Sequence, residues 1–180
     1  PQAARNLDVT AVVMDNGVYG LTKGQSSPTT DIGQITSSTP FGKIEEPINP
    51  LRMYLSMGVS FVASAMSSKV KDMSNLIYQA MNHPGFAIVH IQSPCTEYNN
   101  TYEVLKGNQK KGIAPLAWDI PQEYDPTDIK SAYEIVNSDG IPLGLVFSDD
   151  TRSTFHEKVA EMSRKTGRKS VESLLSSYAV

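Results

Sequence analysis

The chain has 180 residues, 39% of them hydrophobic, which is enough for one globular domain with a sizeable core. No apolar run approaches the roughly 18 residues of a membrane span, and no apolar targeting segment opens the chain, so we expect neither membrane association nor secretion. The formal charge of -3 argues against nucleic-acid binding, although Lys110 and Lys111 form a local basic pair. The single cysteine, Cys95, excludes an internal disulfide and is typical of a reducing cytoplasm.

The first residues, PQAARNLD, have the pattern of the last turn of a helix, with Arg5 near its end and Asn6 as the stop. The chain begins with proline and not with methionine. We therefore expect the sequence to be a portion of a longer protein, with a strand and a helix preceding it.

Short apolar runs that contain β-branched residues predict strands at residues 9–14, 59–63 and 86–92. Between them, residues 50–57 and 70–82 have the start signals, stop signals and apolar periodicity of helices. The order is strand, long loop, helix, strand, helix, strand. It predicts an α/β fold, in which a mostly parallel sheet is flanked by helices and the strands are covered on both faces.

The pattern weakens after Cys95, and residues 96–118 are mostly polar. Asp125 is expected to cap a helix over residues 126–137, and the next apolar run predicts a strand at residues 143–147.

Two further helices are predicted near the end of the chain, at residues 153–165 and 170–177. We expect them to be peripheral. The predicted division is therefore a cofactor-binding domain over residues 1–148 and a peripheral helical part over residues 149–180.

A long polar loop, DNGVYGLTKGQSSPTT at residues 15–30, follows the first predicted strand. In open parallel sheets, ligands bind outside the carboxyl ends of the strands, which is where this loop begins. Cys95 follows the predicted strand at residues 86–92 by three residues. If the two strands are parallel, Asn16 and Cys95 lie at the same edge of the sheet.

Two structural or phosphate-binding interpretations of this loop are weak. Asn16-Gly17 is a type I′ hairpin signal, but the residues that follow do not alternate as a return strand would. The loop also contains the residue types of a phosphate-binding P-loop. Its order is wrong, however, because Lys23 precedes Gly24 whereas that motif has Gly-Lys-Ser or Gly-Lys-Thr.

A third interpretation is a site for a hard cation and a pyrophosphate. The side-chain amide oxygen of an asparagine and a backbone carbonyl two residues later can reach one cation, and Gly17 and Gly20 allow a tight turn around it. Mg²⁺ takes such oxygen ligands and usually keeps phosphate oxygens among them.

The loop at residues 15–30, together with HPGFAIVHIQSPC at residues 83–95, closely resembles the β subunit of 2-oxoacid:ferredoxin oxidoreductases. The 2-oxoglutarate branch is the most similar. The match is dense from Val9 to Cys95 and loose after Tyr102. It implies the fold that binds thiamine diphosphate, also called thiamine pyrophosphate, with the Gly-Asp-Gly start of the cofactor motif upstream of Pro1.

The resemblance also implies roles for single residues. The cofactor-binding set would be Asn16, Gly17, Val18, Tyr19, Gly20, Leu21 and Thr22. Within it, the Asn16 side chain and the Val18 carbonyl would coordinate Mg²⁺, with an upstream aspartate as the third protein ligand. Cys95 would supply one thiolate to a 4Fe-4S cluster whose other cysteines lie upstream; without the resemblance, a lone cysteine is more often a packing residue.

The implied reaction is the oxidative decarboxylation of a 2-oxoacid, with electrons passed through the cluster to ferredoxin and the acyl group passed to coenzyme A. A partner α subunit would supply the glutamate that activates the cofactor. Pyruvate-selective relatives differ at Leu21 and Lys23, and Lys23 could pair with the second carboxylate of 2-oxoglutarate. A solvated lysine that only steadies the loop is equally compatible with the pattern.

Two alternatives for the whole chain stay open: an oxidoreductase subunit for pyruvate or for a broad range of 2-oxoacids, and a cofactor-free remnant that serves only in subunit assembly. Of the histidines, His83 and His156 receive no role, and His90 is expected to be a core histidine within a strand.

Overall fold

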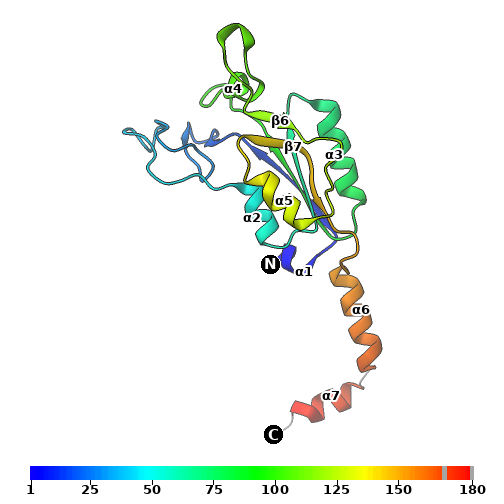
Figure 1. Ribbon diagram of the computed structural model, residues 1–180. Coiled ribbons are helices and arrows are strands. Elements are labelled where there is room, and N and C mark those ends of the chain that lie inside the picture. The colour runs from blue at the N-terminus through cyan, green and yellow to red at the C-terminus, as the bar shows by residue number, and fades with distance from the viewer. Residues whose placement is uncertain (168–169, 179–180) are drawn as a thin grey trace.

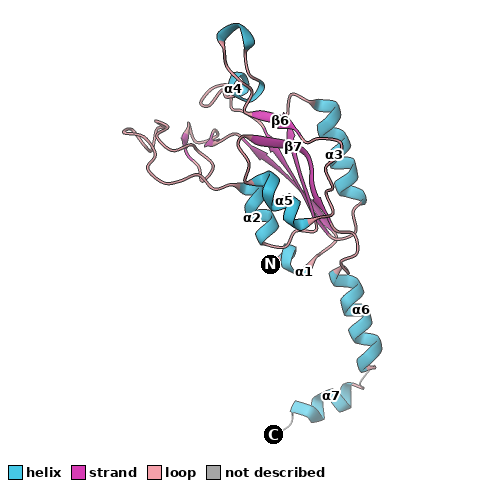
Figure 2. Cartoon of the chain, viewed as in Figure 1, coloured by secondary structure: helices cyan, strands magenta, loops and turns pink. Residues whose placement is uncertain are grey.

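The computed structural model describes residues 1–167 and 170–178, and its centre is a five-stranded sheet (Figures 1 and 2). In spatial order the strands are β1 (Val9–Asp15), β5 (Phe86–Gln92), β4 (Phe61–Met66), β7 (Ile141–Ser148) and β6 (Ala117–Asp119). β1, β5 and β4 are parallel, β7 is antiparallel to β4, and β6 is parallel to β7. The predicted α/β fold with a mostly parallel sheet is confirmed.

Helices cover both faces of this sheet. The helical segments are α1 (Gln2–Arg5), α2 (Pro50–Ser56), α3 (Val70–Asn82), α4 (Tyr102–Lys106), a 3₁₀ turn (Gln109–Lys111), α5 (Ile129–Val136), α6 (Phe155–Thr166) and α7 (Val171–Tyr178). α2 and α5 pack together on one face, and α3 packs on β4 and β5 from the other side (Figure 1). None of the described helices is long and apolar enough to span a membrane.

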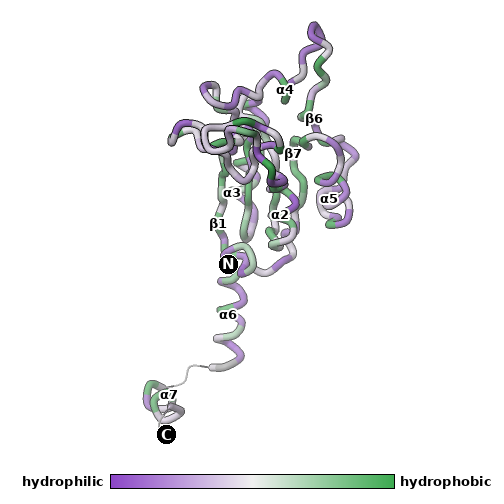
Figure 3. The backbone as a smooth tube through the Cα atoms, turned by 90° about the vertical axis from the view of Figure 1, so that its left-hand side faces the viewer, coloured by the Kyte–Doolittle hydropathy of each residue, from purple (hydrophilic) through white to green (hydrophobic). Residues whose placement is uncertain are grey.

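The central strands are apolar because both of their faces are buried. Every residue of β4 is buried, with Val62 in the core under α2 and α5, and Phe61, Ala63 and Ala65 in the core under α3. Figure 3 shows hydrophobic residues along these strands. This alternation between two cores explains why the sequence shows an apolar run there, interrupted only by the small Ser64, and no period of two.

β1 departs from the expectation that both faces of the strands are covered. It is an edge strand of the described sheet, so only β5 pairs with it. Val9, Val12 and Met14 keep 44–56% of their surface exposed. The prediction of full cover is therefore confirmed for β4 and wrong for β1.

Several predicted boundaries shift. β4 begins two residues later than expected and runs three residues further. α5 begins at Ile129, where the side chain of Asp128 accepts hydrogen bonds from the amides of Lys130 and Ser131. The predicted cap, Asp125, instead accepts from the Thr127 amide in the preceding turn. The capping prediction was wrong because two aspartates with free amides downstream compete for the same helix start.

The two final helices were predicted correctly to within two residues at each end. α6 begins at a capping box in which the Thr154 hydroxyl accepts from the Glu157 amide while the Glu157 carboxylate accepts from the Thr154 amide. Figure 1 shows α6 and α7 extending away from the sheet. The division of the chain at residue 148 stays a prediction.

Asn6 connects several elements at the amino edge of the sheet. It ends α1 in the left-handed conformation, as the stop signal predicts, and its side chain is fully buried. Its amide nitrogen donates to the carbonyls of Arg152 and Ser153, and its amide oxygen accepts from the Ser60 hydroxyl and the Phe86 amide. One side chain thus joins the starts of β4 and β5 to the segment that enters α6.

We predict that Asn6→Ala destabilises the fold, because each buried polar group left without a partner costs roughly 1–3 kcal/mol. Chemical denaturation should show a loss of at least about 2 kcal/mol in the free energy of unfolding. The control is Asn82→Ala, which removes an exposed hydrogen bond to the Tyr78 carbonyl and should change stability by less than about 0.5 kcal/mol. Similar losses in both variants would contradict the role assigned to Asn6.

Candidate functional site

The carboxyl end of β1 closes into two overlapping turns held by side chains. The Asp15 carboxylate accepts from the Gly17 amide at 2.9 Å, and the Asn16 amide oxygen accepts from the Val18 amide at 3.2 Å. Gly17 has φ +70°, a left-handed conformation that a glycine adopts without steric cost. The Asn16 side-chain oxygen and the Val18 backbone are thereby brought into one turn, as the spacing predicts.

These turns exclude the hairpin alternative at Asn16-Gly17. The chain leaving the turn forms β2 (Val18–Tyr19), which pairs with β3 (Gln25–Ser26) and not with β1. The hairpin that does form lies further along the loop and carries residues 20–24 at its tip.

Side chains from other segments fix the same turn from outside. The Asn99 side-chain amide donates to the Asn16 carbonyl at 2.9 Å, and the Thr30 hydroxyl donates to the Gly17 carbonyl. Thr29 donates to the Asp15 carboxylate at 2.8 Å. The two backbone carbonyls that precede Val18 thus both accept a hydrogen bond from a protein side chain.

A buried lysine supports this loop from behind. Lys43 is 5% exposed, and its ammonium donates to the Thr30 carbonyl at 2.7 Å. Thr30 is the residue whose hydroxyl reaches Gly17. Burying an ammonium is costly unless its hydrogen bonds are satisfied, so this contact fixes the path of the chain after β3.

Beneath the turn, the half-buried Asp15 lies beside the buried His90 and Tyr54. His90 Nε2 is 3.3 Å from Asp15 Oδ2, and Tyr54 Oη is 3.1 Å from His90 Nδ1. Burial, the largest influence on Asp15, raises its pKa, but the nearby His90 ring and the hydrogen bonds from Gly17 and Thr29 together outweigh it and lower the pKa. Burial and the Asp15 charge raise the pKa of Tyr54 to about 12. Asp15 is therefore held as a carboxylate acceptor under the loop.

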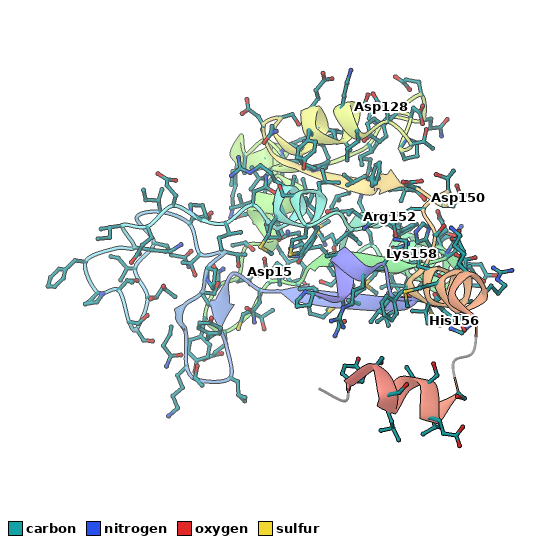
Figure 4. The ribbon with its side chains drawn as sticks, turned by 90° about the horizontal axis from the view of Figure 1, so that it is seen from below. Asp15, Asp128, Asp150, Arg152, His156 and Lys158 are labelled. Carbon is teal, nitrogen blue, oxygen red and sulfur yellow. The ribbon has the colours of Figure 1, made fainter. Side chains whose placement is uncertain are left out.

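The other two histidines lie away from the turn. His83 is buried at the amino edge, with Nε2 2.9 Å from the Ser60 hydroxyl, and burial lowers its pKa. His156 lies on α6, and Figure 4 shows it well apart from Asp15, which marks the point where the projecting loops join the sheet. His90 is buried with a tyrosine partner, as expected of a core histidine.

Cys95 lies at the same sheet edge as Asn16, as predicted. β1 and β5 are parallel with Asp15 opposite Gln92, so the loops that follow them leave side by side. Gly20 shows how close they come. A Cβ atom at Gly20 would lie 3.3 Å from Asn16 Nδ2 and 3.4 Å from Cys95 Sγ. The absence of a side chain there lets the loop backbone approach both groups.

A cavity of about 280 Å³ adjoins the turn. Its walls come from residues 15–17, from the start of α2 and from residues 140–142 at the start of β7. Its lining includes Asp15, Asp31 and His90, and none of the lining residues is lysine or arginine. From this chain alone, the cavity offers no cation to an acidic group of a substrate.

Leu21 and Lys23, the residues predicted to decide the substrate, lie on the tip between β2 and β3. Both are exposed, Leu21 completely, and Lys23 has φ +76°. Neither lines the cavity. The structure thus does not bring these two positions into the cavity beside the Asn16 turn, although they belong to the same loop.

The donor set fits one side of a Mg²⁺ diphosphate site. An amide oxygen and a backbone carbonyl from one turn are the hard oxygen ligands that Mg²⁺ prefers. Among the described residues, no group of three or more His, Cys, Asp or Glu side chains could hold a metal ion, so these residues alone do not form a complete metal site. Likewise, a 4Fe-4S cluster needs four thiolates, and Cys95 is the one cysteine of this sequence.

Comparison with known proteins identifies the family. A family model described as "Thiamine pyrophosphate enzyme, C-terminal TPP binding domain" matches residues 2–91, half of the chain. The chain belongs to the thiamine pyrophosphate enzymes. A second model, which describes the C-terminal part of the pyruvate ferredoxin oxidoreductase beta subunit, matches residues 98–164. The resemblance found in the sequence is thereby confirmed at the family level.

Individual proteins that are similar to this chain are subunits of 2-oxoacid oxidoreductases. The 2-oxoacid:ferredoxin oxidoreductase subunit beta of Saccharolobus solfataricus is 36% identical over 166 residues, which cover 88% of this chain and 54% of that protein. The 2-oxoglutarate oxidoreductase subunit KorB of Mycobacterium tuberculosis is 38% identical over 103 residues, covering 57% of this chain and 28% of that protein. The chain spans about half the length of the first of these relatives.

A solved structure has the same fold. It is the 2-oxoglutarate:ferredoxin oxidoreductase from Magnetococcus marinus with 2-oxoglutarate, coenzyme A and succinyl-CoA bound. It matches with a TM-score of 0.86 at 33% identity, covering 99% of this chain and 61% of that chain.

Proposed function

We propose that this chain is part of the β subunit of a 2-oxoacid:ferredoxin oxidoreductase that converts 2-oxoglutarate to succinyl-CoA and passes the electrons to ferredoxin. The observation that carries the proposal is the meeting of Asn16, Gly20 and Cys95 at one edge of the sheet. A cofactor that decarboxylates the substrate and a cluster that accepts its electrons must lie close together, and this edge brings the proposed residues for both within contact of one glycine. The names of the relatives and the substrate bound to the solved structure support the same reaction.

In this proposal Asn16 and Val18 hold the Mg²⁺ of thiamine diphosphate, and residues 17 and 19–22 line the cofactor. When bound, thiamine diphosphate supplies the reactive carbon centre on which decarboxylation depends. The chain's own residues keep that group in place: Asp15 holds the turn through the Gly17 amide, and Thr30 and Asn99 hold its carbonyls. Cys95 gives one thiolate to the 4Fe-4S cluster.

A partner α subunit is part of the proposal because the loop carries exposed apolar residues. Tyr19 is 53% exposed and Leu21 fully exposed, so another part of the enzyme must cover them before water is excluded from the cofactor, and we assign this cover to the α subunit. Such an oxidoreductase, whose single cysteine in this chain forms no disulfide and is proposed to bind a cluster, suits the reducing cytoplasm.

The substrate is proposed to be 2-oxoglutarate, with a pyruvate or broad 2-oxoacid specificity as the alternative. The second family model is named for pyruvate, whereas a relative and the solved structure are named for 2-oxoglutarate. The cavity beside Asn16 has no lysine or arginine in its lining, so Lys23 on the neighbouring tip is the cation in this loop that could reach a second carboxylate once the partner closes over it.

We predict that the assembled enzyme, assayed by reduction of ferredoxin with coenzyme A present, has a higher kcat/KM for 2-oxoglutarate than for pyruvate. Lys23→Ala should lower kcat/KM for 2-oxoglutarate by about one to two decades, the value of one charge-assisted contact of roughly 1.5–3 kcal/mol, and should leave pyruvate nearly unchanged. Lys71→Ala on α3 is the control and should affect neither substrate. Equal losses for both substrates would assign Lys23 to the loop or the cofactor, and a preference for pyruvate would establish the alternative.

Cys95→Ser tests the electron-transfer half of the proposal. In the assembled enzyme it should alter or abolish the electron paramagnetic resonance signal of the cluster and lower the iron content, because serine is a poor replacement for a cluster thiolate. A cysteine that only packs against the loop would leave iron stoichiometry untouched. Full iron content with an unchanged spectrum would contradict the assignment of Cys95 as a cluster ligand.

A further inference from the structure

Asn99 is the point where three loops meet at the carboxyl edge. Its side-chain nitrogen donates to the Asn16 backbone carbonyl at 2.9 Å, and its side-chain oxygen accepts from the side-chain amide of Gln34 at 3.1 Å. Its backbone amide donates to the Cys95 carbonyl at 2.9 Å. One residue thus touches the turn that carries Asn16, the turn that carries Cys95 and the loop that projects after Thr30.

The two turns on either side of Asn99 are each closed units. Cys95 and Asn99 form an antiparallel bridge, so a shift of Asn99 moves the backbone that carries the Cys95 thiol. On the other side, the carbonyl that Asn99 holds belongs to Asn16, whose side chain is tied to the Val18 amide. A displacement at either turn therefore has a short covalent and hydrogen-bonded path to the other.

Packing makes this connection tight. A Cβ atom at Gly17 would lie only 2.6 Å from Asn99 Nδ2, so the amide rests directly on the backbone of the Asn16 turn. A neutral amide also satisfies two requirements at once, because it donates to one carbonyl and accepts from Gln34. Aspartate would keep the acceptor but set a negative charge against the Asn16 carbonyl, and leucine would keep the shape but offer neither bond.

We propose that Asn99 is a positioning residue that couples the Asn16 turn to the Cys95 turn and so fixes the proposed cofactor site relative to the proposed cluster ligand. The inference rests on the proposed function for its purpose, but the mechanical coupling between the two turns can be measured without any turnover.

The first test compares Asn99→Asp and Asn99→Leu with Asn100→Leu in the assembled enzyme. Asn100 is the exposed neighbour and serves as the matched control. We measure hydrogen exchange at the Gly17 and Val18 amides, the dissociation constant of Mg²⁺-thiamine diphosphate and the paramagnetic signal of the reduced cluster. Both Asn99 variants should speed exchange at Gly17 and Val18, weaken cofactor binding about three- to tenfold and change the cluster spectrum at unchanged iron content. The control should change none of them.

A second test asks whether a disturbance crosses from one turn to the other when Asn99 itself is intact. Gly17→Ala inserts a methyl group against the Asn99 amide, whereas Gly33→Ala meets nothing within 4 Å at a similar φ of +78°. Both variants pay the same backbone cost of roughly 1–2 kcal/mol, so their difference isolates the contact. Gly17→Ala should change the cluster spectrum, and Gly33→Ala should not.

The outcomes separate the two claims. Asn99 variants that only lower thermal stability, or that change one turn without the other, would overturn the coupling. A Gly17→Ala enzyme with the wild-type cluster spectrum would overturn it as well. A wild-type assembly that binds neither thiamine diphosphate nor a cluster would refute the proposed function, and the purpose assigned to Asn99 with it. Hydrogen exchange at Gly17 and Val18, together with the alkylation rate of the Cys95 thiol, would still decide whether Asn99 couples the turns.

Discussion

The register between β1 and β5 is the constraint on which the site depends. Two parallel strands deliver their carboxyl ends to the same edge, and the pairing of Asp15 with Gln92 sets the Asn16 turn beside the loop of Cys95. A slip by one residue would turn every side chain of β1 to the other face and carry Asp15 away from His90. The buried contacts between β1, β5 and the helices therefore determine where the chemically useful loops lie.

Polar side chains then hold these loops in shape, because the loops have few apolar contacts of their own. Asp15, half-buried beside His90, keeps its charge through several donors and uses it to close the turn at Gly17. Lys43 also holds the loop in place, because its ammonium donates a hydrogen bond to the Thr30 carbonyl. These contacts fix the backbone of the loop, so we regard Asp15 and Lys43 as part of the site even though they touch no proposed ligand.

The sequence predicted the sheet and its helices because burial on two faces leaves continuous apolar runs and helices leave a periodic stripe, as in β4 and α3. It also placed Asn16 and Cys95 at one edge by topology alone. It missed β6, since a three-residue strand exists only because β7 lies beside it. It also gave no sign of Asn99, Thr30 or Lys43, whose contacts join residues far apart in the chain and follow no local pattern. The exposure of β1 and of Leu21 could not be predicted either. A sequence pattern shows that a residue is apolar, but it does not show which other residues cover it.

The central claim is that the Asn16 turn binds the Mg²⁺ of thiamine diphosphate, and the most direct measurement is the affinity of the assembled enzyme for that cofactor after Asn16→Ala. Calorimetric titration of thiamine diphosphate in the presence of Mg²⁺ should show binding at least about tenfold weaker than in the wild type, because one oxygen ligand is lost, while the free energy of unfolding stays nearly the same. Asn82→Ala, on the helix α3, should bind the cofactor as the wild type does. An unchanged affinity in the Asn16→Ala enzyme would contradict the account.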